Sequence, residues 1–164
     1  MDVRSLTRAD EASAVRAHEQ LVGEGFELLL GWSPGTDWPA YLDRLERERA
    51  GIDLADGRVP ATFLVAVVDD EVVGRVSVRH ELNDFLARVG GHIGYAVVPS
   101  ARGRGYATAM LRHGLGVLAP LGVTRALVTC DDDNRASAAV IERCGGHLED
   151  VVDGKRRYWV PTRT

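Results

Sequence analysis

The chain has 164 residues and a mass of 17.8 kDa, the size of one domain that buries a core without a disulfide or structural metal. Hydrophobic residues make up 45% and charged residues 27%, which is the composition of an ordinary globular domain. The formal net charge of −4 argues against a nonspecific nucleic-acid binder, because such proteins normally carry a basic excess. We therefore expect a single domain over residues 1–164 and no nucleic-acid partner.

The cellular compartment is predicted from the start of the chain, its apolar runs and its cysteines. Residues 1–10 are charged throughout and lack the apolar segment of a signal peptide. The longest purely apolar run, residues 63–68, is far too short to span a bilayer. Cys130 and Cys144 flank one predicted helix, which separates them too far for a disulfide. The sequence predicts a cytoplasmic protein without a membrane partner.

Hydrophobic periodicity predicts secondary structure in the order β-α-α-β-β-β-α-β-α-β-β. The strands are expected at residues 2–6, 61–68, 72–80, 91–98, 126–130, 148–152 and 157–160. The helices are expected at residues 7–22, 37–51, 105–118 and 134–144. An antiparallel first half that leads into a β-α-β crossover predicts a mixed α/β sheet with helices on both faces.

Local signals set several boundaries. Asp37 and Pro39 are typical of a helix start, and Gly51 of its end. Residues 69–70, both aspartates, predict a tight turn between two strands. The loop over residues 23–37 is so apolar that we expect other elements to cover it.

Glycine is enriched, with 18 residues, ten of which fall between positions 90 and 146. In this region a strand ends at a proline, and a loop with two arginines and two glycines leads into the most regular helix. Helix N-termini bind anions, glycine lets the backbone approach the anion, and arginine adds positive charge. Arg102, Gly103, Arg104 and Gly105 therefore predict a cradle for a phosphate or pyrophosphate.

Spacing separates the kinds of phosphate cradle. A P-loop needs Gly-Lys-Ser/Thr, which this loop lacks. A dinucleotide fingerprint needs a third glycine, where this chain has Thr108, and an acidic residue about twenty positions later, where it has Val123 and Thr124. A third motif fits better.

Arg102-x-x-Gly105-x-Ala107 resembles the Gln/Arg-x-x-Gly-x-Gly/Ala motif of the GNAT superfamily of N-acetyltransferases, and it has Val97-x-Pro99 ahead of it. Asn134-x-x-Ser137 and residues 142–146 resemble that superfamily's Asn-x-x-Ala…Tyr-Glu-Lys-x-Gly-Phe segment. Residues 79–83, 90–95 and 129–131 look like a bacterial subgroup of predicted acetyltransferases. The resemblance covers residues 3–160 and is sharpest over residues 91–146.

The resemblance implies a GNAT-like, mostly antiparallel sheet with a splay between the fourth and fifth strands. It also implies acetyl-CoA as cosubstrate, with no metal, and transfer of the acetyl group to a primary amine of a small molecule or peptide by direct attack on the thioester. The implied cofactor-binding residues are Val97, Val98, Arg102, Gly103, Arg104, Gly105, Tyr106, Ala107, Thr108 and Asn134. The net charge slightly favours a cationic acceptor, and a homodimer stays open.

The catalytic groups are less sharply indicated. The superfamily's frequent tyrosine, which protonates the leaving thiolate, aligns with Ile141, and Ser137 lies one helical turn earlier on the same face. Ser137 either assists the thiolate or bonds its own backbone. His92, His80 and Glu81 are candidates for the base that deprotonates the amine, and each also has a purely structural interpretation.

Other residues allow two interpretations. Tyr95 either contacts the thioester or packs in the core, and Phe26, Trp32 and Trp38 either line the acceptor pocket or pack in the core. We interpret residues 131–133, three aspartates, as a solvated turn.

Two other functions stay open for the whole chain. Because the tyrosine is missing, the chain is alternatively an acyl-CoA-binding or sensing domain without turnover. The other alternative is a nucleotide-binding module.

Overall fold

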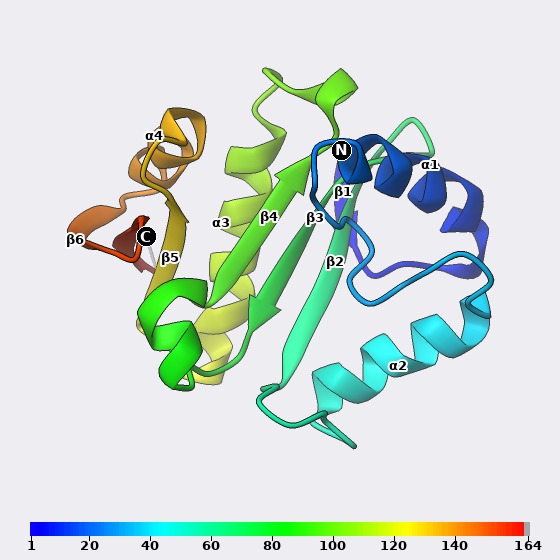
Figure 1. The fold of residues 1–164 in the computed structure, drawn as a ribbon, viewed down its shortest axis with the longest axis horizontal. Helices are drawn as coiled ribbons and strands as arrows, with labels where there is room; N and C mark the ends of the chain where they lie inside the picture. The colour runs from blue at the N-terminus through cyan, green and yellow to red at the C-terminus, as the bar shows by residue number, and fades with distance from the viewer. Residues whose placement is uncertain (163–164) are drawn as a thin grey trace.

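The computed structural model describes residues 1–162, which build a seven-stranded sheet in the order β1-β2-β3-β4-β5-β7-β6 (Figure 1). The strands are β1 (Asp2–Arg4), β2 (Ala61–Val68), β3 (Glu71–Arg79), β4 (Ile93–Val97), β5 (Arg125–Asp131), β6 (His147–Val152) and β7 (Lys155–Pro161). The helices are α1 (Glu11–Val22), α2 (Trp38–Ala50), α3 (Tyr106–Leu118) and α4 (Arg135–Arg143). The predicted order of these elements is confirmed.

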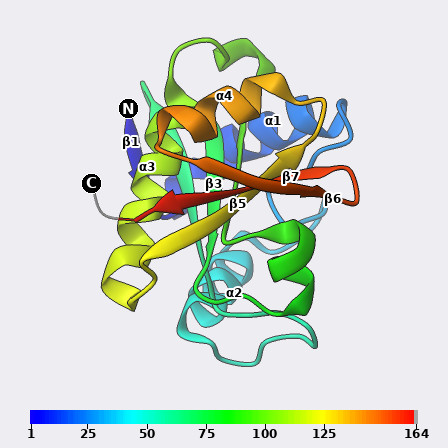
Figure 2. The same ribbon diagram turned by 90° about the vertical axis from the view of Figure 1, so that its left-hand side faces the viewer.

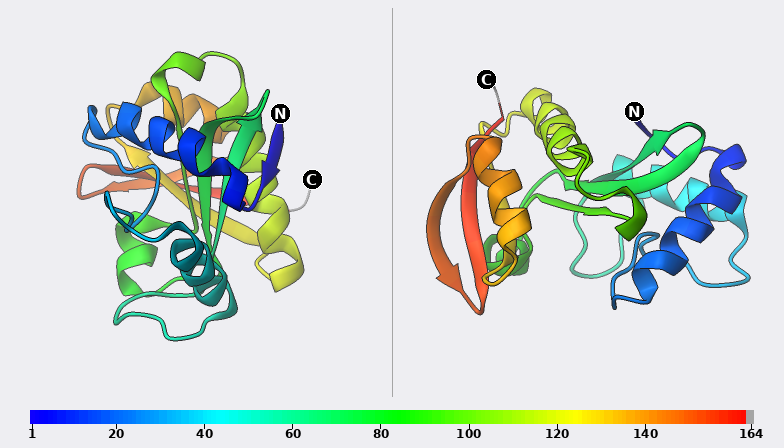
Figure 3. Two further views of the ribbon diagram at one scale, coloured as in Figure 1. Left: turned by 90° about the vertical axis from the view of Figure 1, so that its right-hand side faces the viewer. Right: turned by 90° about the horizontal axis from the view of Figure 1, so that it is seen from above.

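Helices cover both faces of the sheet, as predicted, and a hydrophobic cluster fills each interface. Seen from above, α1 and α2 lie on one side of β2, β3 and β4, and α3 lies on the other (Figure 3). The cluster under α3 and α4 includes Met110, Leu111, Leu115, Leu118 and Ile141. The cluster under α1 and α2 includes Ala14, Ala17, Leu21, Leu28, Leu29 and Tyr41. The apolar loop between α1 and α2 is therefore covered, because Leu28 and Leu29 are buried in that cluster.

The sheet is antiparallel except at its centre, where β4 and β5 run parallel and pair only at Ile93 and Val128. By contrast, β3 and β4 pair all the way from Gly74 and Val97 to Val78 and Ile93. In Figure 2, β5 and β7 run obliquely to β3. The predicted splay between the fourth and fifth strands is confirmed, and beyond Ile93 it leaves one edge of β4 facing a gap.

The local signals act as expected at the ends of elements. The Asp37 side chain accepts a hydrogen bond from the backbone N–H of Ala40 at 3.0 Å and caps α2. Gly51 ends α2 in the left-handed region, with φ of 71°. Asp69 and Asp70, with φ of 50° and 63°, make the tight turn of the β2–β3 hairpin.

One short element is absent from the sequence prediction, which gave residues 81–90 no structure. Leu86–Gly90 forms a single π-helical turn, so Gly90 is not on a strand, and β4 begins at Ile93 instead of residue 91. Gly91 joins the two with φ of 66°, and a side chain there would start 2.6 Å from the carbonyl oxygen of Leu127. The backbones of two strands thus approach each other closely at this glycine.

Within residues 1–162, no helix combines the length and the apolar character needed to cross a membrane.

The start of α1 supplies a testable prediction about stability. Asp10, 5% exposed, accepts hydrogen bonds from Arg4 Nη1 at 2.7 Å and from the Thr7 backbone N–H at 2.7 Å. The hydrogen bond from Arg4 lowers the pKa of Asp10 to about 2. Because this pKa lies below its unfolded value, the stability it contributes is present above pH ~4 and is lost as the pH falls towards about 2.

We expect Asp10→Asn to lower the free energy of unfolding by about 2 kcal/mol at pH 7, and by much less near pH 2. Urea unfolding at several pH values measures this difference. Asp2→Asn is the control, because Asp2 is exposed and lies 3.5 Å from Arg4. A penalty for Asp10→Asn that stayed constant with pH would contradict the prediction.

Candidate active site

The main chain of β4 determines what faces the gap beside β5. The backbone N–H of Val98 donates to the carbonyl of Val73 at 2.9 Å, and its carbonyl accepts from the N–H of Ala101 at 3.0 Å. Successive residues of an antiparallel strand direct these groups to opposite sides, so Val97 and Tyr95 direct theirs towards β5. The N–H of Val98 is thus bound to β3, whereas the N–H groups of Tyr95 and Val97 face the gap. The CoA-binding roles of Val97 and Val98 stay predictions.

The loop before α3 has the backbone conformation that the sequence predicts for an anion cradle. Gly103 and Gly105 are in the left-handed region, with φ of 77° and 81°, and no atom lies within 4 Å of the Cβ position of either. Gly105 is the N-cap of α3, so the first N–H groups of the helix, from Tyr106 onward, have no intrahelical partner. The loop residues are exposed, and this end of the helix is open to an anion.

Arg102 does not have the free charge expected of it. Its Nη2 lies 2.6 Å from Oε2 of Glu24, near the end of α1, and its Nε donates to the carbonyl of Val97 at 3.2 Å. The hydrogen bond from Arg102 lowers the pKa of Glu24. Arg104 is therefore the arginine of this loop whose charge is not neutralised by an ion pair within residues 1–162.

At the start of α4, Asn134 and Ser137 make contacts that the sequence did not predict, and their expected roles stay predictions. The Asn134 side-chain oxygen accepts from the Ser137 backbone N–H at 3.0 Å and caps the helix. The Ser137 hydroxyl lies 2.7 Å from the hydroxyl of Tyr95 on β4, so it neither bonds its own backbone nor is free. Ile141 is fully buried in the core and exposes nothing to the gap.

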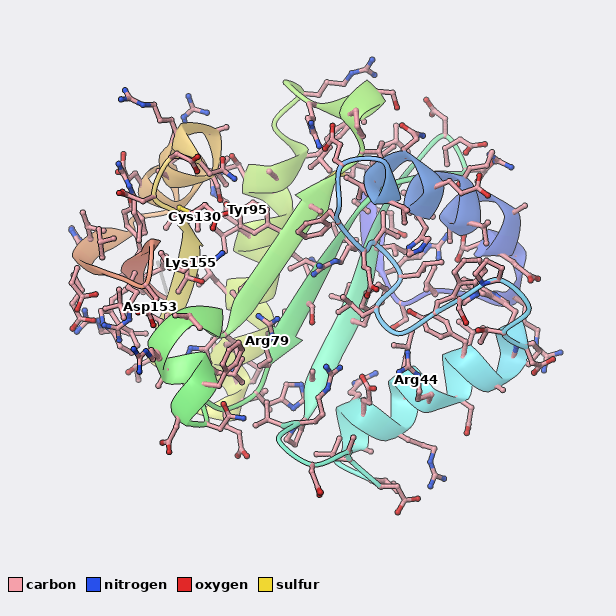
Figure 4. All side chains as sticks on the ribbon, in the orientation of Figure 1. Arg44, Arg79, Tyr95, Cys130, Asp153 and Lys155 are labelled. Carbon is pink, nitrogen blue, oxygen red and sulfur yellow. The ribbon has the colours of Figure 1, made fainter. Side chains whose placement is uncertain are left out.

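Tyr95 is the residue whose importance the sequence left undecided. Its hydroxyl also donates to the carbonyl of Ser137 at 3.3 Å, and Figure 4 shows its side chain and that of Cys130 between β4 and β5. Burial raises the pKa of Tyr95 to about 12 and also raises the pKa of the Cys130 thiol. At neutral pH the phenol therefore keeps its proton and is a potential proton donor in the gap.

His92 has a geometry that disfavours it as a base. Its Nδ1 accepts a hydrogen bond from the backbone N–H of Leu127 at 2.9 Å, which places the proton of the neutral ring on Nε2. Burial, with a smaller contribution from Arg79, lowers the pKa of His92 to about 4. A ring with one nitrogen occupied and the other protonated offers no lone pair to an amine, so this geometry does not favour the predicted role of His92 as the base.

The other two candidates for the base lie where β3 ends. The His80 Nε2 is 2.8 Å from the Thr62 hydroxyl, and burial lowers the pKa of the ring. Glu81 is exposed. Their catalytic roles stay predictions.

Asp131 is the last residue of β5, and Asp132 and Asp133 form a turn after it, so the turn interpreted from the sequence begins one residue later than expected. Asp131 pairs with Lys155 and Asp132 with Arg156, so this turn is tied to β7 by ion pairs. Across residues 1–162, no group of three or more His, Cys, Asp or Glu side chains is arranged to hold a metal ion.

The three aromatic residues that were left open have different environments. Trp38 is buried, stacks on Tyr41 and belongs to the core. Trp32 packs edge-on against His18 of α1. Phe26 is 40% exposed and lies over the guanidinium of Arg75, a residue that the sequence analysis did not single out.

Comparison with protein families decides the family. The model of the family described as "Acetyltransferase (GNAT) family" matches residues 25–146, which is most of the chain. The chain belongs to the acetyltransferase (GNAT) family. This GNAT chain is 41% identical over 97 residues to L-2,4-diaminobutyric acid acetyltransferase from Nocardia farcinica. The alignment covers 54% of the chain and 47% of that relative, so the chain matches about half of the relative's length.

Solved structures share the fold of this GNAT chain. Mycobacterium smegmatis RimJ in complex with CoA-disulfide is 23% identical, with a TM-score of 0.71 over 97% of this chain and 80% of RimJ. The acetyltransferase yncA from Salmonella typhimurium, with its cofactor acetyl-CoA, is 14% identical, with a TM-score of 0.61 over 98% and 93% of the two chains. A spermidine N-acetyltransferase SpeG chimera from Vibrio cholerae and hSSAT is 17% identical, with a TM-score of 0.61 over 99% and 97%.

Proposed function

We propose that this GNAT chain transfers the acetyl group of acetyl-CoA to a primary amine of a small molecule or peptide. The observation that carries the proposal is the gap between β4 and β5, faced by the main chain of Tyr95 and Val97. A strand edge of this kind pairs with an extended, amide-containing ligand. The family match and the neighbours solved with CoA or acetyl-CoA support the same cosubstrate.

The parts of the chain that would hold CoA follow from the site. The free N–H groups at the start of α3, from Tyr106 to Thr108, would bind the pyrophosphate, and Gly103 and Gly105 leave space for it. Arg104 would add charge, whereas Arg102 would fix the loop through Glu24. The amide nitrogen of Asn134 is available to the pantetheine arm, because the side-chain oxygen caps α4.

Acetyl-CoA supplies an activated acyl group whose carbonyl carbon is attacked by the lone pair of the amine. We assign Tyr95 to give its hydroxyl proton to the sulfur as the carbon–sulfur bond breaks. The hydrogen bond to Ser137 fixes the direction of the phenol. This pair would take over the role of the superfamily's tyrosine, whose position in this chain is occupied by Ile141. The proton lost by the amine passes to water, and the phenolate regains a proton in turn.

Two measurements test this function. Acetyl-CoA is expected to raise the Tm of the protein, whereas ATP and NAD are not. Release of free thiol from acetyl-CoA is then followed with a panel of amines, and we expect it to depend on the amine. Stabilisation by acetyl-CoA without thiol release for any amine would instead support a binding or sensing domain, and stabilisation by ATP or NAD alone would support a nucleotide-binding module.

A further inference from the structure

Two arginines of β3, Arg75 and Arg79, lie on the face of the sheet that α1 and α2 cover. The alternate residues Val76 and Val78 belong to the cluster under α3, so the arginines point to the opposite side. Figure 4 labels Arg79 at the end of β3. Arg75 lies under the Phe26 ring, 5.0 Å from its centre.

Both guanidinium groups meet above Gly94 of β4. The atoms nearest to the Cβ position of this glycine are Arg79 Nη1 at 3.5 Å, Arg75 Nη1 at 3.6 Å and Arg79 Nη2 at 3.8 Å. Gly94 has no side chain to fill the space between them. Two positive groups therefore converge on one bare stretch of backbone, next to Tyr95.

Neither arginine forms an ion pair within residues 1–162, and the Glu27 carboxylate acts on Arg75 only from a greater distance. Arg75 is 5% exposed, and its contacts are the carbonyls of Gly94 and Glu27, both at 3.4 Å. Its Nε is buried without any hydrogen-bond partner. Arg79 donates to the carbonyls of Gly90 and Gly91 at 3.2 and 3.4 Å.

This arrangement is costly unless an anion completes it. Burial lowers the pKa of Arg75 to about 10 and also lowers that of Arg79, and the two groups repel each other. Arginine stays protonated in proteins at neutral pH, so both groups are positively charged. Buried charges are normally paired, and an arginine fork matches the two oxygens of a carboxylate. An unpaired Nε together with two converging forks is therefore an incomplete carboxylate site.

The position of the pair relates it to the acceptor. Beside Gly94 the cover on the side of α1 and α2 is incomplete, because Gly94 and Arg79 are only partly buried, so an acceptor would approach the gap from that side. Gly94 precedes Tyr95, whose main chain borders the gap. An anion bound over Gly94 would thus hold an amine close to the proposed position of the thioester.

We propose that Arg75 and Arg79 bind the carboxylate of the acceptor, and that the acceptor is a free amino acid whose amine lies a few bonds from that carboxylate. The net charge of −4 favoured a cationic acceptor, but the local charge at this place is positive. This inference rests on the proposed function, because it assigns the substrate class of the same site.

The test compares amino acids with their neutral amides. The acceptors are L-2,4-diaminobutyrate, L-ornithine and L-lysine, the α-carboxamide of each, and 1,3-diaminopropane. For the best substrate, we expect kcat/KM to exceed that of its amide by about 10-fold to 100-fold, the range for a charged hydrogen bond. Isothermal titration of the same pairs into the CoA-saturated protein gives a second readout, in which the carboxylate form binds more tightly by a similar factor.

The variant that carries the test is Arg79→Gln, and Arg75→Lys is a second variant that keeps the buried charge but not the fork. Arg79→Gln is expected to bring the ratio of kcat/KM for the carboxylate form to kcat/KM for its amide close to one. The change should come mainly from a lower kcat/KM for the carboxylate form. Arg75→Lys is expected to lower the ratio by at least a factor of about ten. Arg88→Gln is the control, because Arg88 is exposed and pairs with Asp153. Circular dichroism and thermal melting establish that each variant is folded.

The outcomes separate this inference from the proposed function. If the amides or 1,3-diaminopropane are acetylated as fast as every carboxylate form, the carboxylate site is overturned. The proposed acetyl transfer is not affected by that result. Faster acetylation of the N-terminal amine of a peptide than of any free amino acid overturns the assignment to a free amino acid. Absence of thiol release overturns the proposed function, whereas carboxylate-dependent binding that Arg79→Gln removes would still support the site.

Discussion

Replacing Gly105 by valine is expected to abolish the rise in Tm that acetyl-CoA gives, while the protein stays folded. Gly105 has φ of 81°, and outside its two neighbours no atom lies within 4 Å of its Cβ position, so a Cβ there meets no other part of the protein. It would instead occupy the space beside the first N–H groups of α3, where the pyrophosphate is proposed to bind. At a concentration 100 times its Kd, a ligand stabilises a protein by about 2.7 kcal/mol, and this stabilisation should disappear.

The matched control for backbone strain is Gly122→Val. Gly122 has φ of 83° and also has nothing within 4 Å of its Cβ position, but it follows α3 at the far end from the loop. A left-handed conformation costs a substituted residue about 1–2 kcal/mol, which lowers Tm by about 2–8 °C in both variants. Only Gly105→Val should lose the response to acetyl-CoA. An unchanged Kd for CoA in Gly105→Val would show that the loop does not bind the pyrophosphate.

The fold could be predicted because its signals are local. The cap at Asp37, the turn at residues 69–70 and the amphipathic α3 each depend on residues that are neighbours in sequence. The π-helical turn at Leu86–Gly90 was missed because five residues are too few to show a period. Its existence depends instead on contacts with other elements, such as the packing of Gly91 against Leu127.

The candidate site shows contacts that no local motif indicates. The motif at Arg102 and Gly105 predicts an anion cradle at the start of α3, but Arg102 forms an ion pair with Glu24, which lies 78 positions away. Tyr95 and Ser137 meet across 42 positions, and neither residue alone indicates the pair. Such contacts depend on how strands and helices pack, which periodicity does not report.

Two further features depend on packing that the sequence does not report: the direction of the main-chain groups on β4 and the surroundings of the two arginines on β3. Alternation along a strand puts Arg75 and Arg79 on one face, but it does not tell whether carboxylates lie opposite them. Only the packed structure shows that Gly94 faces both arginines. Similarly, only the packed structure shows that the N–H of Val98 donates to Val73 of β3. The N–H groups of Tyr95 and Val97 therefore face the gap.

Tyr95→Phe is expected to lower kcat by about 100-fold or more, with little change in the Kd for CoA, because it removes the proposed proton donor and keeps the ring. Single-turnover acetylation and titration with CoA measure the two quantities. Ser137→Ala should give a smaller loss of kcat, because the phenol remains but its hydrogen bond at 2.7 Å is lost. Since the pKa of Tyr95 is about 12, this group should cause no fall in rate between pH 7 and pH ~10.

The control is Tyr41→Phe, which removes another buried phenol whose pKa is raised to about 12 and whose hydroxyl donates to a backbone carbonyl, that of Leu30. The two variants should lose similar stability, so a difference in kcat between them reports the chemistry and not the packing. If Tyr95→Phe keeps the kcat of the unmodified chain, the sulfur takes its proton from water. The bond between Tyr95 and Ser137 would then serve only to join β4 to α4, and its loss should appear in Tm alone.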